Sequence, residues 1–106
     1  MANFVVRIEL HDATWQDYQK LHQAMELSGF SRTIVGADGI HYELPPAEYH
    51  FPESGLNGVQ VHDRAKAVAN STGRINTIVV TESKGITFSG LRPVHPAANV
   101  GLRRFG

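Results

Sequence analysis

In two segments of this chain, residues 3–11 and 39–44, apolar side chains occupy every second position. A period of two is typical of a strand in an antiparallel sheet that has one buried face and one solvated face. The apolar side chains are Phe4, Val6, Ile8 and Leu10 in the first segment and Ile40, Tyr42 and Leu44 in the second. The alternate positions carry ionisable groups, which are Arg7, Glu9, His11, His41 and Glu43. The pattern predicts a sheet with an apolar face and a titratable face.

The remaining sequence predicts a small α+β domain. The expected elements are strand 3–11, helix 14–27, strand 30–35, strand 40–44, helix 57–72 and strand 75–81, with a last short strand at 86–88. Residues 47–51 form either a short edge strand or an ordered loop. The order β-α-β-β-α-β is that of the ferredoxin-like fold, an antiparallel sheet with two helices on one face. Its spatial strand order, four-one-three-two, would make strands 3–11 and 40–44 neighbours.

The helices have recognisable starts and apolar faces. Thr14 with Asp17, and Asn57 with Gln60, resemble capping pairs at the two N-termini. The first helix has an apolar stripe at helical spacing, formed by Trp15, Tyr18, Leu21 and Met25. We therefore expect Trp15 in the core and His22, which borders the stripe, packed or half-exposed. The alternation also turns Tyr42 inward, so the sheet lacks the exposed aromatic pair that RNA-recognition sheets use to stack bases.

Composition sets limits on the kind of protein. The chain has 106 residues, 42% apolar and 19% charged, which is the size and make-up of one globular domain. Without cysteine it has no disulfides, thiolate ligands or cysteine nucleophile. No apolar run approaches the roughly 20 residues of a membrane span, and the N-terminal residues enter a strand directly instead of forming a signal peptide. We expect a cytoplasmic location and no membrane partner.

Charge is distributed unevenly along the chain. Residues 1–91 contain seven Lys or Arg and ten Asp or Glu, a balance of −3, whereas residues 92–106 contain three Arg and no acid. We expect residues 1–91 to form a single domain and residues 92–106 to be a flexible basic tail. The domain lacks the basic excess that tight, general nucleic-acid binding requires.

If the two alternating strands are neighbours, their polar side chains can perform acid–base chemistry. Cleavage of RNA by its own 2′-hydroxyl needs a base, an acid and a positive group on the phosphate, and it needs no metal. The candidate catalytic residues are His11, His41, Glu9, Glu43 and Arg7, with Asp12 at the exit of the first strand as a further acid or as a helix-capping residue. The same groups also suit an ordinary solvated sheet face. A metal site made from the histidines and glutamates is a further alternative, but the spacing matches no metal motif, and we expect no cofactor.

The stretch from Ser28 to Gly39, SGFSRTIVGADG, is similar to the GhoS-like antitoxins of type V toxin–antitoxin systems, which are small bacterial proteins with a ferredoxin-like fold. The resemblance covers roughly residues 3–83. Uncharacterised bacterial proteins with segments like Leu44–Tyr49, LPPAEY, are more similar still. The resemblance implies an endoribonuclease that cuts the messenger RNA of a membrane-active toxin. In small CRISPR-associated nucleases of this fold an acid at the end of the first strand is implicated, and Asp12 occupies a comparable place.

A second hypothesis is a non-catalytic, dimeric binding or regulatory module. The strand at 75–81 has apolar residues on both faces, which favours a partner that covers the sheet. We expect a homodimer whose interface includes Val5, Ile78 and Val80. A metal-dependent hydrolase is the third hypothesis.

Overall fold

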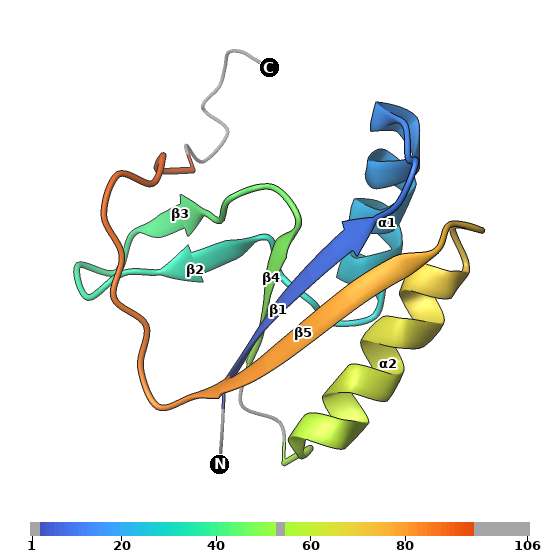
Figure 1. The fold of residues 1–106 in the computed structure, drawn as a ribbon. Coiled ribbons are helices and arrows are strands. Elements are labelled where there is room, and N and C mark those ends of the chain that lie inside the picture. The colour runs from blue at the N-terminus through green and yellow to red at the C-terminus, as the bar shows by residue number, and fades with distance from the viewer. Residues whose placement is uncertain (1–2, 53–54, 95–106) are drawn as a thin grey trace.

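The computed structural model describes residues 3–52 and 55–94 (Figure 1). Its elements are β1 (Asn3–Leu10), α1 (Trp15–Leu27), β2 (Thr33–Val35), β3 (His41–Glu43), β4 (Glu48–Phe51), α2 (Gly58–Asn70) and β5 (Asn76–Ser83). They form a three-stranded antiparallel sheet in the order β4-β1-β5 and a separate hairpin of β2 and β3. The predicted class, α+β with two helices and antiparallel sheets, is confirmed.

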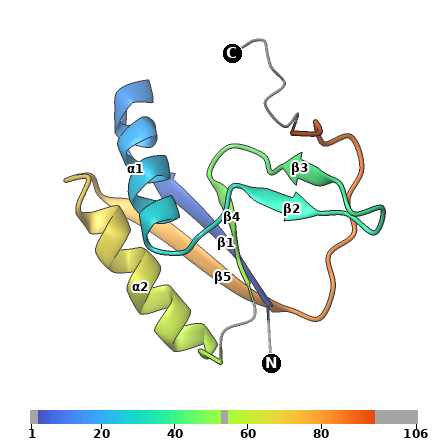
Figure 2. The same cartoon turned by 180° about the vertical axis from the view of Figure 1, so that it is seen from behind.

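The core lies between the three-stranded sheet and the two helices. Its buried side chains are Phe4, Val6, Ile8 and Leu10 of β1, Tyr49 and Phe51 of β4, Leu21 and Met25 of α1, Val61, Ala65 and Ala69 of α2, and Phe30. The alternate positions of β1 become increasingly exposed toward its C-terminal end, as the period of two predicts. Both helices cover the same side of the sheet (Figures 1 and 2). In the part of the chain that the structure describes, the opposite side carries no helix.

Both helix starts follow the predicted capping chemistry. In α1 the backbone N–H of Asp17 donates to Thr14 Oγ1 over 3.2 Å, and the Thr14 N–H donates to Asp17 Oδ2 over 2.9 Å. Asn57 and Gln60 make the same reciprocal pair in α2. The expectation for Trp15 is wrong, because its side chain is 74% exposed. Trp15 is the first residue of α1, and the first turn of this helix extends beyond the end of β1 (Figure 1).

The predicted pairing of strands 3–11 and 40–44 is also wrong. β1 pairs with β4, where Val5 lies opposite His50 and Arg7 opposite Glu48. β3 pairs with β2, with Ile34 opposite Tyr42, so the neighbours that the predicted order gave to the second and third strands are confirmed. The tight turn at residues 36–40 favours this local hairpin, and two consecutive prolines then end the strand, since proline has no N–H for the ladder. The next strand along the chain that pairs with β1 is β4, which begins at Glu48 and lies at an edge of the larger sheet. The edge-strand alternative for residues 47–51 is therefore confirmed.

The hairpin remains connected to the larger sheet and to the end of the described chain. Ser31 and His50 form an isolated antiparallel bridge with two backbone hydrogen bonds of 2.8 Å. No strand forms at residues 86–88. Instead, the Glu43 N–H donates to the Arg92 carbonyl over 2.8 Å, and the Val94 N–H donates to the His41 carbonyl over 2.9 Å. Residues 92–94 of the predicted tail thus line the outer edge of β3, whereas residues 95–106 lie outside the described residues.

Candidate functional site

The side of the three-stranded sheet that faces away from the helices is called the open face here. Its side chains are Val5, Arg7 and Glu9 of β1, Glu48 and His50 of β4, and Thr77, Val79 and Thr81 of β5. Residues directly opposite in an antiparallel ladder point to the same face, so the register places Arg7 between Glu48 and Val79. The polar face predicted for β1 is confirmed. The neighbouring strand contributes Glu48 and His50 to it, not His41 and Glu43.

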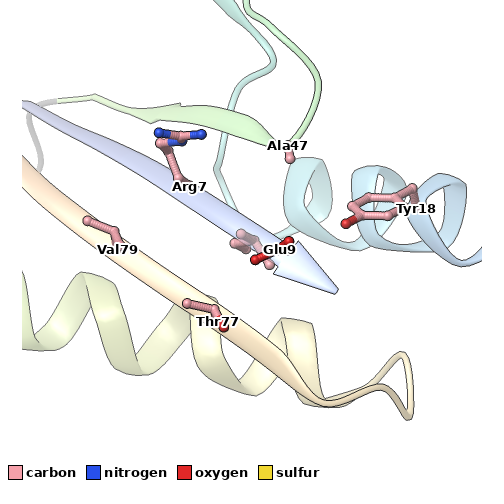
Figure 3. A pocket seen from close by; sticks show the side chains of 7 residues that line it. Arg7, Glu9, Tyr18, Ala47, Thr77 and Val79 are labelled. Carbon is pink, nitrogen blue, oxygen red and sulfur yellow. The ribbon is translucent and has the colours of Figure 1, made fainter. Parts of the chain in front are cut away.

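A cleft of about 340 Å³ lies on the open face near the end of β1 (Figure 3). It is called the Arg7 cleft, and its walls are Arg7, Ile8, Glu9, Tyr18, Ala47, Thr77 and Val79. The Arg7 side chain is 73% exposed, and its Nε lies 3.7 Å from Glu48 Oε2. A long, exposed ion pair of this kind is weak. The guanidinium can therefore exchange this partner for an anionic ligand.

His11 lies just beyond the end of β1 and is anchored to β5. Its backbone N–H donates to the Ile75 carbonyl over 2.8 Å, and its Nε2 lies 2.8 Å from Thr77 Oγ1. Thr77 is the register partner of Glu9 and a wall of the Arg7 cleft. Arg7, Glu9 and His11 thus occupy successive outward positions, with Thr77 beside the last two. A cation, a carboxylate and an imidazole along one strand can bind a phosphate and transfer protons.

His41 and Glu43 do not join this group. Both are exposed on β3, in the other sheet. His41 lines a different cleft of about 410 Å³, between the hairpin and the Asn3 end of the larger sheet, which also contains His50, Ser31 and Thr33. The predicted five-residue cluster is therefore divided between two sheets. Tertiary contacts bring His41 into one cleft with His50, a pairing that strand alternation alone did not predict.

His50 is a site candidate that sequence reasoning missed. The segment Tyr49-His50-Phe51 itself has the period of two, with both aromatic side chains buried and the imidazole on the open face. That short alternation was the available signal. Partial burial lowers the pKa of His50 below its ordinary value, because burial penalises the charged form. His50 is therefore more suited to a neutral role, as a hydrogen-bonding group or a base, than to the role of a charged phosphate ligand.

Asp12 stands in the turn after β1, in the left-handed region with φ of 53°. It does not cap α1, since Thr14 is the N-cap residue, so the capping interpretation is wrong. The side chain is exposed and adjacent in sequence to His11. A carboxylate is therefore present at the exit of the first strand, as expected, without a structural role in starting the helix.

Two residues expected at an apolar interface face the core instead. Ile78 and Val80 of β5 pack against the buried cluster beneath the helices. The open face of β5 carries Thr77, Val79 and Thr81, and only the second of these is apolar. The prediction that Ile78 and Val80 form an outer surface is thus wrong. Val5 does lie on the open face, where it is half-buried.

Within residues 3–52 and 55–94, no group of three or more His, Asp or Glu side chains is arranged to hold a metal ion. The described helices include none that could span a membrane. Neither protein-family models nor the curated proteins give a match to the chain.

Proposed function

We propose that this protein is an endoribonuclease that cleaves single-stranded RNA on the open face, without a metal ion, by attack of the 2′-hydroxyl on the adjacent phosphodiester. One observation carries the proposal. Arg7 and Glu9 line a cleft of about 340 Å³, and His11, which is hydrogen-bonded to Thr77, follows them just beyond the end of the same strand. This set contains the three groups that the reaction requires: a phosphate-binding cation, a base and an acid.

The roles follow from the chemistry of each group. Glu9 takes the proton of the 2′-hydroxyl, and the 2′-oxygen forms a bond to phosphorus. The bond from phosphorus to the 5′-oxygen breaks, and the His11 imidazolium protonates the leaving oxygen. Arg7 binds the non-bridging oxygens and stabilises the charge that develops on them. The products are a 2′,3′-cyclic phosphate and a free 5′-hydroxyl.

Thr77 acts as a positioning residue for His11. Its hydroxyl engages Nε2 over 2.8 Å. Among the described residues no hydrogen bond to Nδ1 is found, so Nδ1 is the ring nitrogen available to the substrate. An imidazolium held through one nitrogen keeps a defined orientation, which general acid catalysis needs.

The likeness to GhoS-like antitoxins agrees with this proposal at the level of topology. If the hairpin of β2 and β3 is treated as an insertion between Ser31 and β4, the remaining elements are β1, α1, β4, α2 and β5, and counting the isolated Ser31–His50 bridge as a further strand after α1 gives the order β-α-β-β-α-β. The Ser31–His50 bridge then stands for the contact between the second and third strands of a ferredoxin-like sheet. On this interpretation the substrate is the messenger RNA of a membrane-active toxin, and the enzyme works in the cytoplasm.

The test is cleavage of a labelled single-stranded RNA in the presence of EDTA. We expect the parent protein to produce 2′,3′-cyclic phosphate ends, and a 2′-deoxy residue at the cleavage position to block the reaction. His11→Ala and Glu9→Gln should each reduce kcat by about 10²- to 10⁴-fold. His41→Ala, which removes an exposed imidazole from the other sheet, is the matched control and should retain activity. An inactive parent, or a His11→Ala variant as active as the parent, would overturn the proposal.

One observation favours the second hypothesis, a dimeric binding module. β5 is eight residues long and pairs with β1 on one side only, and in the described chain nothing pairs with its other side. Val79 on this strand is 55% exposed. A long, unprotected edge strand is a ready surface for pairing with another chain. A second copy that pairs β5 with β5 would extend the sheet across a two-fold axis.

A further inference from the structure

A second cleft adjoins the proposed cleavage site. It measures about 400 Å³ and is called the Trp15 cleft; its walls are Trp15, Tyr18, Gln19, His22, Arg32, Pro46 and Ala47. Tyr18 and Ala47 also line the Arg7 cleft, so the two clefts share two walls. Figure 3 shows both shared residues near the end of β1, close to Glu9. A chain bound across the Arg7 cleft can therefore continue directly into the Trp15 cleft.

Trp15 gives the second cleft a flat aromatic wall. Its side chain is 74% exposed, although it is the largest apolar side chain of the protein and its only tryptophan. Exposure on this scale adds nothing to the core. Exposed aromatic rings are the usual platforms on which single-stranded nucleic acids stack their bases.

His22 gives the same cleft a deeply buried polar group. The side chain is 6% exposed and also lines the cleft. Its Nδ1 lies 2.6 Å from the Tyr49 hydroxyl. No hydrogen bond to Nε2 is found in residues 3–52 and 55–94. Burial, together with the charge of Arg32, lowers the pKa of His22 to about 4. The neutral ring therefore keeps one nitrogen for a directional hydrogen bond with a ligand.

Arg32 and Gln19 complete the set. Arg32 lies in the segment between α1 and β2. It is half-buried and brings a positive charge to the cleft. Gln19 offers an amide, which can donate and accept at the same time. An aromatic platform, a guanidinium and two neutral hydrogen-bonding groups match a nucleotide, which has a flat base, a polar base edge and a phosphate.

We propose that the Trp15 cleft is a nucleotide subsite of the endoribonuclease, which stacks the base next to the cleaved phosphodiester on Trp15 and binds its phosphate through Arg32. This inference rests on the proposed function, because it extends the substrate from the Arg7 cleft into its neighbour. The volume of about 400 Å³ lies within the range of small-molecule sites. Gln19 and His22 would read the edge of the base.

The test uses binding, which does not depend on cleavage. Because Trp15 is the only tryptophan, its fluorescence reports on this cleft alone. We expect saturable quenching by at least one of the four ribonucleoside 5′-monophosphates, and by a 2′-deoxy oligonucleotide that cannot be cleaved. Arg32→Ala should weaken nucleotide binding about tenfold. Lys20→Ala is the matched control, because it removes an exposed cation from α1 that does not line the cleft.

The results separate this inference from the proposed function. Cleavage by the parent protein without quenching by any nucleotide or by the deoxy oligonucleotide would overturn the subsite and leave the cleavage site standing. Quenching without cleavage would support the subsite as a binding site and overturn the enzyme. Equal affinities of Arg32→Ala and Lys20→Ala would also overturn the subsite. If the parent cleaves, Trp15→Ala should raise KM about tenfold with kcat unchanged, and Trp15→Phe should recover part of the loss.

Discussion

Inside the core, Nδ1 of His22 and the hydroxyl oxygen of Tyr49 lie 2.6 Å apart and join α1 to β4. Both side chains are buried. A polar pair in such surroundings is stable only while each group satisfies the other, because neither can recover its hydrogen bonds from water. Burial lowers the pKa of the imidazole and raises the pKa of the phenol, so both groups are neutral at physiological pH.

We predict that the protein loses stability as the solution is acidified from pH 7.5 to pH 4.5. The pKa of His22 falls from 6.5 to about 4 on folding, so the unfolded chain binds more protons between these two values. The free energy of unfolding is therefore highest above pH 6.5 and decreases as the pH falls toward 4, by on the order of 3 kcal/mol in total. His50, whose pKa is also lowered by burial, acts in the same direction. Denaturant unfolding at a series of pH values measures the effect.

His22→Gln should flatten the acidic side of that profile, while His62→Gln, which replaces a half-exposed histidine of α2, should leave it as in the parent. A parent protein equally stable at pH 7.5 and pH 5 would contradict the burial of a neutral imidazole.

Tyr49→Phe should destabilise the protein by about 1–3 kcal/mol, since Nδ1 of His22 would stay buried without a partner. The matched control is Tyr42→Phe. Its hydroxyl donates to Asp38 Oδ2 over 2.7 Å at an exposed position, where water can replace the lost bond. Thermal or denaturant unfolding of both variants provides the comparison, and equal losses would argue against the buried pair as a core contact.

Thr77→Val should lower kcat for RNA cleavage about tenfold with little change in KM, because it removes the hydrogen bond that orients His11. Thr77→Ser keeps the hydroxyl and should restore most of the rate. Single-turnover cleavage at saturating enzyme isolates this step. Loss of activity in both variants alike would assign Thr77 a packing role.

If the protein forms a homodimer through β5, sedimentation equilibrium at micromolar concentration should give twice the mass of the monomer. Val79→Lys, which places a charge on the exposed strand, should shift the protein to monomer. Val59→Lys makes the same change on α2, at a valine that is 70% exposed, and should remain dimeric. A monomeric parent would remove the dimer hypothesis.

Local patterns predicted much of this fold correctly. The alternation of residues 3–10 identified β1 together with its buried and exposed faces, and the pairs Thr14–Asp17 and Asn57–Gln60 marked both helix starts. The same alternation placed Arg7 and Glu9 on the face away from the core. Each of these features depends on neighbours within a few residues, so the sequence contains all the information that they require.

Strand pairing could not be obtained from the same patterns. Two segments, His41–Glu43 and Tyr49–Phe51, both have the period of two, and each is a plausible neighbour for β1. β3 has β2 on one edge and hydrogen-bonds to residues 92–94 on the other, so β4 is the strand that pairs with β1, which exchanged His41 and Glu43 for His50 and Glu48 on the open face. Trp15 is a similar case, because helical spacing placed it in the apolar stripe although its side chain is exposed in the structure.

The amino-acid sequence by itself determined the two helices, their caps and the two faces of the first strand, because these depend on contacts close along the chain. Only the tertiary structure decided which strand lies beside β1, and hence which titratable groups share a surface. That choice depends on the joint packing of distant segments, because residues 92–94 occupy the edge of β3 that the predicted order gave to β1, and β4 pairs with β1 in its place.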